Sequence, residues 1–237
     1  MNERTIQQWV RAGVLFGASP ARQSPDLERL LLDTARVCPT DPRLFVLAVS
    51  WLVEYGSYIA RHRLKELIRN ELDAESRSVL GVLLDTAIDA GAVGQLRIAL
   101  DECRPGESEE PLFAADRKDD VVREAVRESA TSTSRRWKRL VQPFEPKRES
   151  LRPAKWILEH NPEYRDRALR KGDLRCSILE TLNRDIQTAN SESELARLCG
   201  ASRTAVRHAL DELEREGVDL RNRTRRNRRD QPIGLTA

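Results

Sequence analysis

The chain lacks a long apolar segment. Its 237 residues contain no run of about 18 apolar residues, which is the length that a membrane-spanning helix needs. The first nine residues, MNERTIQQW, also lack the apolar core of a secretory signal peptide. We therefore expect a cytoplasmic protein that does not associate with a membrane.

Cysteines and histidines are few and scattered: Cys38, Cys103, Cys176 and Cys199, and His62, His160 and His208. The cysteines form no CxxC pair, which argues against a disulfide framework or a zinc site and favours buried free thiols in a reducing compartment. HExxH, GxSxG and P-loop patterns are absent as well. We therefore expect no cofactor, no metal ion and no catalytic residues.

One pattern keeps an enzymatic alternative open. Glu145 and Lys147 form an acidic-x-Lys pair, which some metal-dependent nucleases carry on a core strand behind an upstream acid such as Asp119 or Asp120. In this chain the pair lies between prolines in a charged segment. A metal-dependent nuclease is therefore the third and weakest interpretation.

The net charge of +3 hides an uneven distribution. Residues 1–130 carry 17 Lys and Arg against 22 Asp and Glu, residues 131–170 carry 11 against 5, and residues 171–237 carry 13 against 11. The first half should repel a polyanion, whereas the basic charge lies in the middle segment and near the C-terminus. A DNA-binding surface attached to a separate dimerisation or partner domain has this distribution.

The first hundred residues contain helix signals and no alternating strand pattern. Ser24-Pro25 and Asp41-Pro42 each place an N-cap residue before a proline, which is favoured at the first helical position. We predict a helix from each start, the second ending near Gly56. Apolar spacing predicts further helices over 58–68, 79–88 and 96–100. The sequence therefore predicts a mainly α fold.

The pattern divides the chain into three parts. Residues 1–103 are expected to form an α-helical domain for dimerisation or partner binding, residues 104–153 a linker, and residues 154–237 a second domain. The candidates for the self-association or partner surface are the exposed-looking apolar residues Trp9, Val10, Leu15 and Phe16. A helix from Pro153 to His160 should pack onto the second domain through Trp156, Ile157 and Tyr164.

The predicted linker is polar, with a short helix expected over 120–129 and a basic cluster around a tryptophan. The cluster consists of Arg135, Arg136, Trp137, Lys138 and Arg139. An aromatic ring among basic residues can stack on nucleic-acid bases. The commoner role of such a tryptophan is to anchor a linker onto its own domain. Both interpretations stay open at this point.

Residues 191–213 have the pattern of a helix-turn-helix. Ser191 and Glu194 have the spacing of a capping box, Gly200 lies where a turn needs positive φ, and Ser202 is a good N-cap for a second helix. Gly217 should end that helix. In such a pair the first helix supports the second, and the second enters the major groove of DNA.

The second helix of the pair separates apolar from polar residues. Val206, Leu210 and Leu213 form its apolar stripe, and an upstream helix with Ile178, Leu179, Leu182 and Ile186 should complete a three-helix core. The outward residues near its N-terminal end are the predicted DNA contacts: Ser202, Arg203, Thr204, Arg207 and His208. An arginine in this position can form two hydrogen bonds with a guanine.

An arginine-rich segment follows. Val218, Leu220, Ile233 and Leu235 could be the apolar positions of two short strands, with 222–230 as the hairpin between them. Its arginines are predicted to contact phosphates or the minor groove: Arg221, Arg223, Arg225, Arg226, Arg228 and Arg229. The alternative is a disordered tail that improves solubility.

The segment SESELARLCGASRTAVRHALDELEREGV resembles the winged helix-turn-helix of bacterial GntR-like and MarR-like transcription regulators. The matching features are Glu-Leu-Ala in the supporting helix, the Gly-x-Ser-Arg-Thr turn and the Leu-x-x-Leu-x-x-x-Gly-Val exit. The resemblance covers residues 171–237. The preceding NPEYRDRALRKGDLRCSILETL resembles the lead-in of some regulators and antitoxins encoded beside nucleotidyltransferase-type toxins.

The resemblance implies a C-terminal winged helix-turn-helix with a small β-hairpin wing. It further implies a sequence-specific regulator that binds double-stranded DNA, most often as a repressor and a homodimer. The alternative is an antitoxin-type or defence-system subunit, whose N-terminal domain binds another protein and whose winged domain autoregulates its operon.

Overall fold

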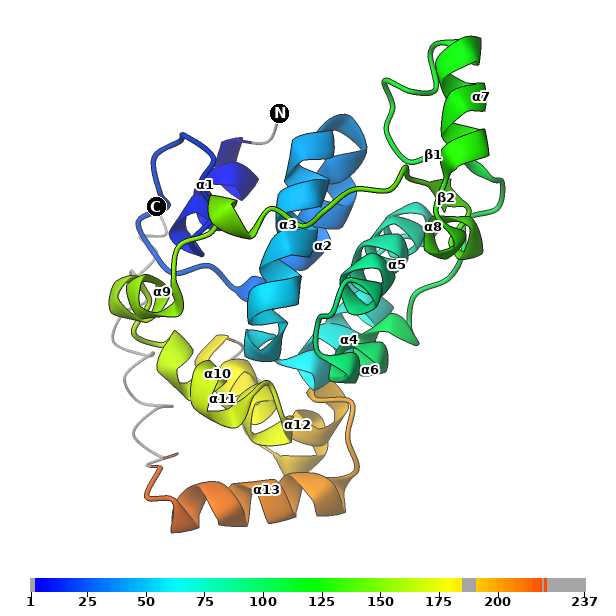
Figure 1. Cartoon of the computed structure of the whole chain (residues 1–237). Coiled ribbons are helices and arrows are strands. Elements are labelled where there is room, and N and C mark those ends of the chain that lie inside the picture. The colour runs from blue at the N-terminus through cyan, green and yellow to red at the C-terminus, as the bar shows by residue number, and fades with distance from the viewer. Residues whose placement is uncertain (1–2, 185–190, 219, 221–237) are drawn as a thin grey trace, which may run out of the picture.

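The computed structural model describes residues 3–184, 191–218 and 220, which are mainly helical (Figure 1). In the first part of this range the helices are α1 (Glu3–Arg11), α2 (Leu27–Val37), α3 (Pro42–Tyr55), α4 (Arg61–Glu71), α5 (Ala74–Asp89), α6 (Arg97–Leu100), α7 (Asp120–Ser129) and α8 (Ser132–Arg136). They are followed by α9 (Ala154–His160), α10 (Tyr164–Arg170), α11 (Leu174–Arg184), α12 (Glu192–Leu198) and α13 (Arg203–Arg215). Within the described residues, no helix combines the length and apolar character needed to cross a bilayer.

Local capping explains where several helices begin. Asp41 accepts a hydrogen bond from the Leu44 amide at 3.1 Å and starts α3 at Pro42, as predicted. The predicted start of α2 at Ser24 is wrong, because the Asp26 carboxylate accepts from the Arg29 amide and the helix begins two residues after Pro25. Helix α7 has the predicted bounds. The sequence pattern does not predict α1, α8 and α10.

The larger apolar core lies between α1, α2, α3 and α5 and includes Trp9, Phe45 and Trp51. Trp9 is 1% exposed, and its Nε1 donates to Thr34 Oγ1 at 2.8 Å. The prediction that Trp9 belongs to an exposed association surface is therefore wrong, because its partner comes from α2, 25 positions along the chain. Val10 and Phe16 are half-buried, and Leu15 is exposed. The four free cysteines are buried, as predicted.

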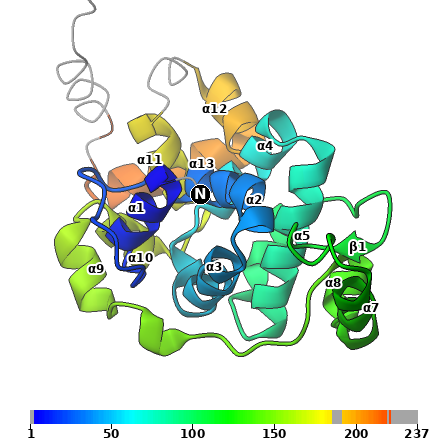
Figure 2. The same ribbon diagram turned by 90° about the horizontal axis from the view of Figure 1, so that it is seen from above.

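The segment that follows α6 packs onto this core. Strands β1 (Glu110–Pro111) and β2 (Arg139–Leu140) form a short parallel sheet with Glu110 opposite Arg139. Beyond β2 the chain runs across α3 to α9 in both views (Figures 1 and 2), and the Phe144 ring packs edge-on against Phe45. The larger core therefore extends past the predicted boundary at residue 103.

Helix α9 packs onto the larger core and not onto the C-terminal helices, which overturns the predicted placement of its aromatic face. Ile157 is buried against Gly13, and Trp156 packs against the same cluster. The Tyr164 hydroxyl donates to the Pro25 carbonyl at 2.6 Å. These contacts take the larger core past the predicted boundary at residue 153 as well.

A second apolar core lies between α11, α12 and α13. Its buried residues are Ile178, Leu179, Leu182, Leu195, Ala196, Cys199, Val206, Ala209 and Leu213. We call these helices the three-helix unit. The predicted wing, residues 221–237, and Ile186 lie outside the described residues.

Buried ion pairs join the three-helix unit to the larger core. The Arg167 guanidinium of α10 contacts Glu28 of α2 at 2.6 and 2.9 Å and Glu180 of α11 at 2.6 Å. Arg63 of α4 contacts Glu28 at 3.0 Å and Asp26 at 2.8 Å. We call these five residues the junction cluster. Since these groups are almost entirely buried, the junction cluster is an internal contact between the unit and the core.

Candidate nucleic-acid interface

Helices α12 and α13 form the helix-turn-helix pair at the end of the molecule opposite α7 and α8 (Figure 1). The Ser191 Oγ accepts from the Glu194 amide at 3.2 Å, and the Ser202 Oγ accepts from the Ala205 amide at 3.1 Å. Both predicted N-caps are therefore confirmed. Gly217 has φ of +77° and follows the last turn of α13, as predicted.

Gly200 fits the turn for two reasons. Its φ is +55°, where a side chain is strained, and a Cβ atom would lie 2.5 Å from Glu66 Oε1 of α4. The turn between α12 and α13 is thus in close contact with the larger core. Sequence reasoning found the backbone requirement, but not the contact with Glu66.

The predicted contact residues of α13 share one exposed surface. Val206, Ala209 and Leu213 face the second core and are buried. The exposed residues at or near the N-terminal end of the helix are Ser202, Arg203, Thr204, Arg207 and His208. The fold therefore leaves these five side chains accessible to a large partner.

An ion pair orients one of these arginines. Arg207 Nη2 lies 2.8 Å from Glu192 Oε2 in the first turn of α12. The hydrogen bond from Arg207 lowers the pKa of Glu192, and the same bond raises the pKa of Arg207. The pair is exposed, so it is weak and screened by salt. Sequence reasoning missed Glu192, because no helical spacing links positions on two helices joined by a turn.

The described part of the three-helix unit has no excess of positive charge. Residues 174–184, 191–218 and 220 carry six arginines against seven carboxylates. The arginines from Arg221 to Arg229 lie outside the described residues. The described part of the three-helix unit therefore offers no net positive charge to a polyanion.

The basic cluster around Trp137 has the geometry of an anchor. Trp137 Nε1 donates to Asp85 Oδ2 at 2.8 Å, and the same oxygen lies 2.9 Å from Arg136 Nη2. The Trp137 ring lies so close to Gly81 that a Cβ there would be 2.3 Å from the ring. Helix α5 supplies both Gly81 and Asp85, so Trp137 holds the segment onto α5.

The other members of the cluster also bond within the protein. Arg139 is 5% exposed and lies 2.8 Å from Glu110, and the exposed Arg135 lies 3.2 Å from Glu109. The exposed Lys138 donates to the Glu107 carbonyl at 3.0 Å. Helix α8 lies beside α5 and well away from α13 in Figure 1, so the cluster and the helix-turn-helix do not form one continuous surface.

The acidic-x-Lys pattern of Glu145 and Lys147 does not belong to a metal site within the described residues. Among the described residues, no group of three or more His, Cys, Asp or Glu side chains could hold a metal ion. Asp119 caps α7, whereas the Lys147 amide donates to Ser50 Oγ of α3. Asp119 is thus a capping residue of α7, and the backbone of Lys147 attaches its segment to α3.

Comparison of the chain with models of protein families, with curated proteins and with solved structures finds no match. What the described residues define is a mainly helical protein with an accessible helix-turn-helix pair.

Proposed function

We propose that this protein is a DNA-binding transcription regulator that acts as a repressor. The observation that carries the proposal is the second helix of the pair, which presents Arg203, Thr204 and Arg207 to solvent next to its N-terminal end. Helix-turn-helix proteins insert that part of the helix into the major groove. The resemblance of residues 171–237 to winged regulators supports the same function.

In the proposed complex, Arg203 and Arg207 contact base edges, and a guanine is the partner that arginine reads best. Ser202, Thr204 and His208 contact the sugar-phosphate backbone. The arginines of residues 221–229 neutralise phosphates in the wing or tail. Two copies would bind one palindromic site as a two-fold dimer, and we expect the larger cores to supply the contact between them.

The test is selection of a binding sequence from a random duplex library, followed by fluorescence anisotropy with the selected and with scrambled DNA. Arg207→Ala should weaken binding to the selected duplex by ~1–3 kcal/mol and leave binding to scrambled DNA almost unchanged. Arg215→Ala is the matched control, because Arg215 is exposed at the other end of α13. No selectable sequence, or equal effects of both variants, would contradict the proposal.

The alternative, an antitoxin-type or defence-system subunit, is favoured by α7. This helix stands out from the body in Figure 1, with Val121 79% exposed and Val122 40% exposed. A partner protein could cover this face. Affinity purification from the native host tests the alternative, since a stoichiometric partner should be retained by the natural chain and lost from Val121→Asp. Light scattering of the purified chain separates this outcome from a homodimer.

A further inference from the structure

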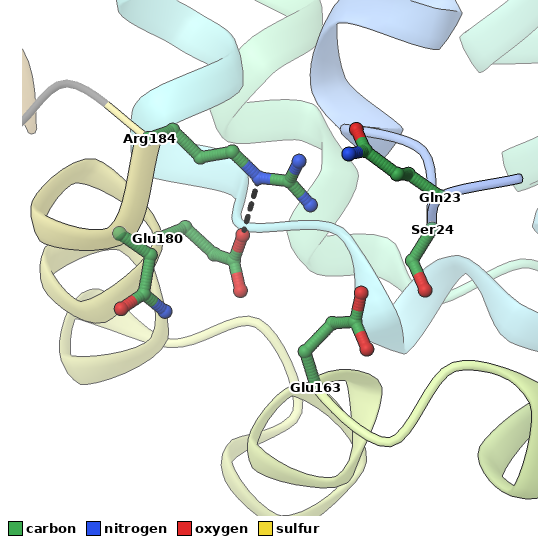
Figure 3. A pocket seen from close by; sticks show the side chains of 6 residues that line it. Gln23, Ser24, Glu163, Glu180 and Arg184 are labelled. Carbon is green, nitrogen blue, oxygen red and sulfur yellow. Dashed lines mark ion pairs between the residues drawn. The ribbon is translucent and has the colours of Figure 1, made fainter. Parts of the chain in front are cut away.

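A polar pocket of about 400 Å³ lies at the junction between the larger core and the three-helix unit. Figure 3 shows side chains from three separate segments around it. They are Gln23 and Ser24 from the loop before α2, Glu163 from the start of α10, and Glu180, Asn183 and Arg184 from α11. Pockets of this size accommodate small organic molecules.

The charges around the pocket are unequally compensated. Glu180 contacts Arg167 at 2.6 Å and Arg184 at 3.5 Å, so its charge is balanced by two guanidinium groups. Arg184 also donates to the Pro25 carbonyl at 3.3 Å. Glu163 forms no ion pair or hydrogen bond with another described side chain, although its carboxylate lies at the pocket wall (Figure 3). The pocket therefore has one uncompensated negative charge.

Neutral hydrogen-bonding groups lie on the same side of the pocket as this carboxylate. In Figure 3 the Ser24 hydroxyl lies beside the Glu163 carboxylate and on the same side of the pocket as Gln23, and the Arg184 guanidinium extends from α11 between Glu180 and Gln23. Within the described part of the chain, neither Ser24 nor Gln23 has a side-chain hydrogen bond. Ser24 is available because Asp26, and not Ser24, caps α2. The loop before α2 and the start of α10 thus offer acceptors side by side, while α11 presents the ion pair of Arg184 with Glu180.

We propose that this pocket binds a small organic cation with a primary ammonium or guanidinium group. A charge-assisted hydrogen bond to Glu163 would hold the cationic group, and the Ser24 hydroxyl and the Gln23 amide oxygen would accept hydrogen bonds from its other N–H groups. An anionic ligand is disfavoured, because Glu180 already balances the Arg184 guanidinium at the wall, whereas Glu163 has no cationic partner among the described residues. The ligand class follows from these side chains and does not depend on DNA binding.

Binding of a ligand in the pocket would also affect the junction cluster. Glu180 belongs both to the pocket wall and to the buried pair with Arg167, which in turn contacts Glu28 of α2. A ligand that touches α11 and the loop before α2 at once would strengthen the attachment of the three-helix unit to the core. We therefore expect the cation to increase the free energy of unfolding of the protein.

The experiment is isothermal titration calorimetry of the full chain with 1,4-diaminobutane and with 1-amino-4-guanidinobutane. The matched neutral probe is 1,4-butanediol, which has the same spacing of polar groups without the charge. We expect saturable binding of at least one cation and none of the diol. Glu163→Gln should weaken the affinity at least about tenfold, whereas Glu163→Asp should keep part of it.

Glu159→Gln is the control variant, since Glu159 is an exposed carboxylate on α9 outside the pocket. It should bind the cation as the natural chain does. Three results would overturn the proposal: no saturable binding of either cation, equal binding of the diol, or equal affinities of the Glu163→Gln and Glu159→Gln variants. None of these results bears on the proposed DNA-binding function, which the anisotropy assay tests separately.

Discussion

Replacing Glu28 by glutamine tests whether the junction cluster holds the two cores together. Glu28 is 0% exposed and accepts hydrogen bonds from Arg63, from both terminal nitrogens of Arg167 and from the Ala60 amide at 2.8 Å. Glutamine preserves the shape but removes the charge. Two buried guanidinium groups then share Asp26 and Glu180 as their remaining carboxylates in the cluster.

Removing one partner of a buried ion pair costs about 3–5 kcal/mol. Since single domains are stable by about 5–15 kcal/mol, the Glu28→Gln protein should lose a large part of its free energy of unfolding. The matched control is Glu71→Gln. Glu71 lies only 2.6 Å from Arg29, but that pair is partly exposed, so its loss should cost about 0–1 kcal/mol.

Urea unfolding followed by far-UV circular dichroism measures both variants. With a slope of about 2–3 kcal/mol per molar urea, the midpoint of Glu28→Gln should fall by about 1–2 M. Tryptophan fluorescence adds a second reading, because the four tryptophans, Trp9, Trp51, Trp137 and Trp156, all belong to the larger core or pack against it. A midpoint for Glu28→Gln equal to that of Glu71→Gln would refute the reasoning.

Single features of the chain support three further predictions. Deleting residues 221–237 should weaken binding to all DNA sequences about equally. It should also reduce the slope of log K against log salt by up to about 0.9 for each phosphate that the protein no longer neutralises. An unchanged slope would contradict a role of this segment in binding phosphates. Gly200→Ala should lower the stability of the fold more than Gly217→Ala does. An alanine at positive φ costs about 1–2 kcal/mol at either position, but only Gly200 faces Glu66. Equal melting temperatures of the two variants would show that Glu66 moves aside without cost. Burial raises the pKa of Asp26, but Arg63 outweighs this effect and holds the pKa well below its usual value. This contribution to stability is therefore present above the unfolded pKa of about 3.9 and is lost as the pH falls toward the folded pKa. An acid titration of Asp26→Asn should accordingly be flatter than that of the natural chain, and parallel titrations would show that Asp26 does not contribute in this way.

Several features could be predicted from the sequence because their causes are local. Asp41-Pro42 starts α3, Ser191 and Ser202 cap α12 and α13, and Gly200 and Gly217 have positive φ. In each of these the cap or backbone requirement lies within a few residues, so spacing alone is sufficient. The spacing also predicts that Arg203 and Arg207 lie on the polar face of α13, where the structure finds them exposed.

The contacts between distant segments depended on the tertiary structure. The sequence suggests a surface position for Trp9, whereas the structure buries it and pairs it with Thr34 of α2. Trp137 is an anchor because Gly81 and Asp85 lie on the side of α5 that faces it. The pairing of Glu192 with Arg207 needs the angle between two helices. Local spacing determines helices and caps, whereas the partner of a side chain depends on how helices separated by tens of residues pack together.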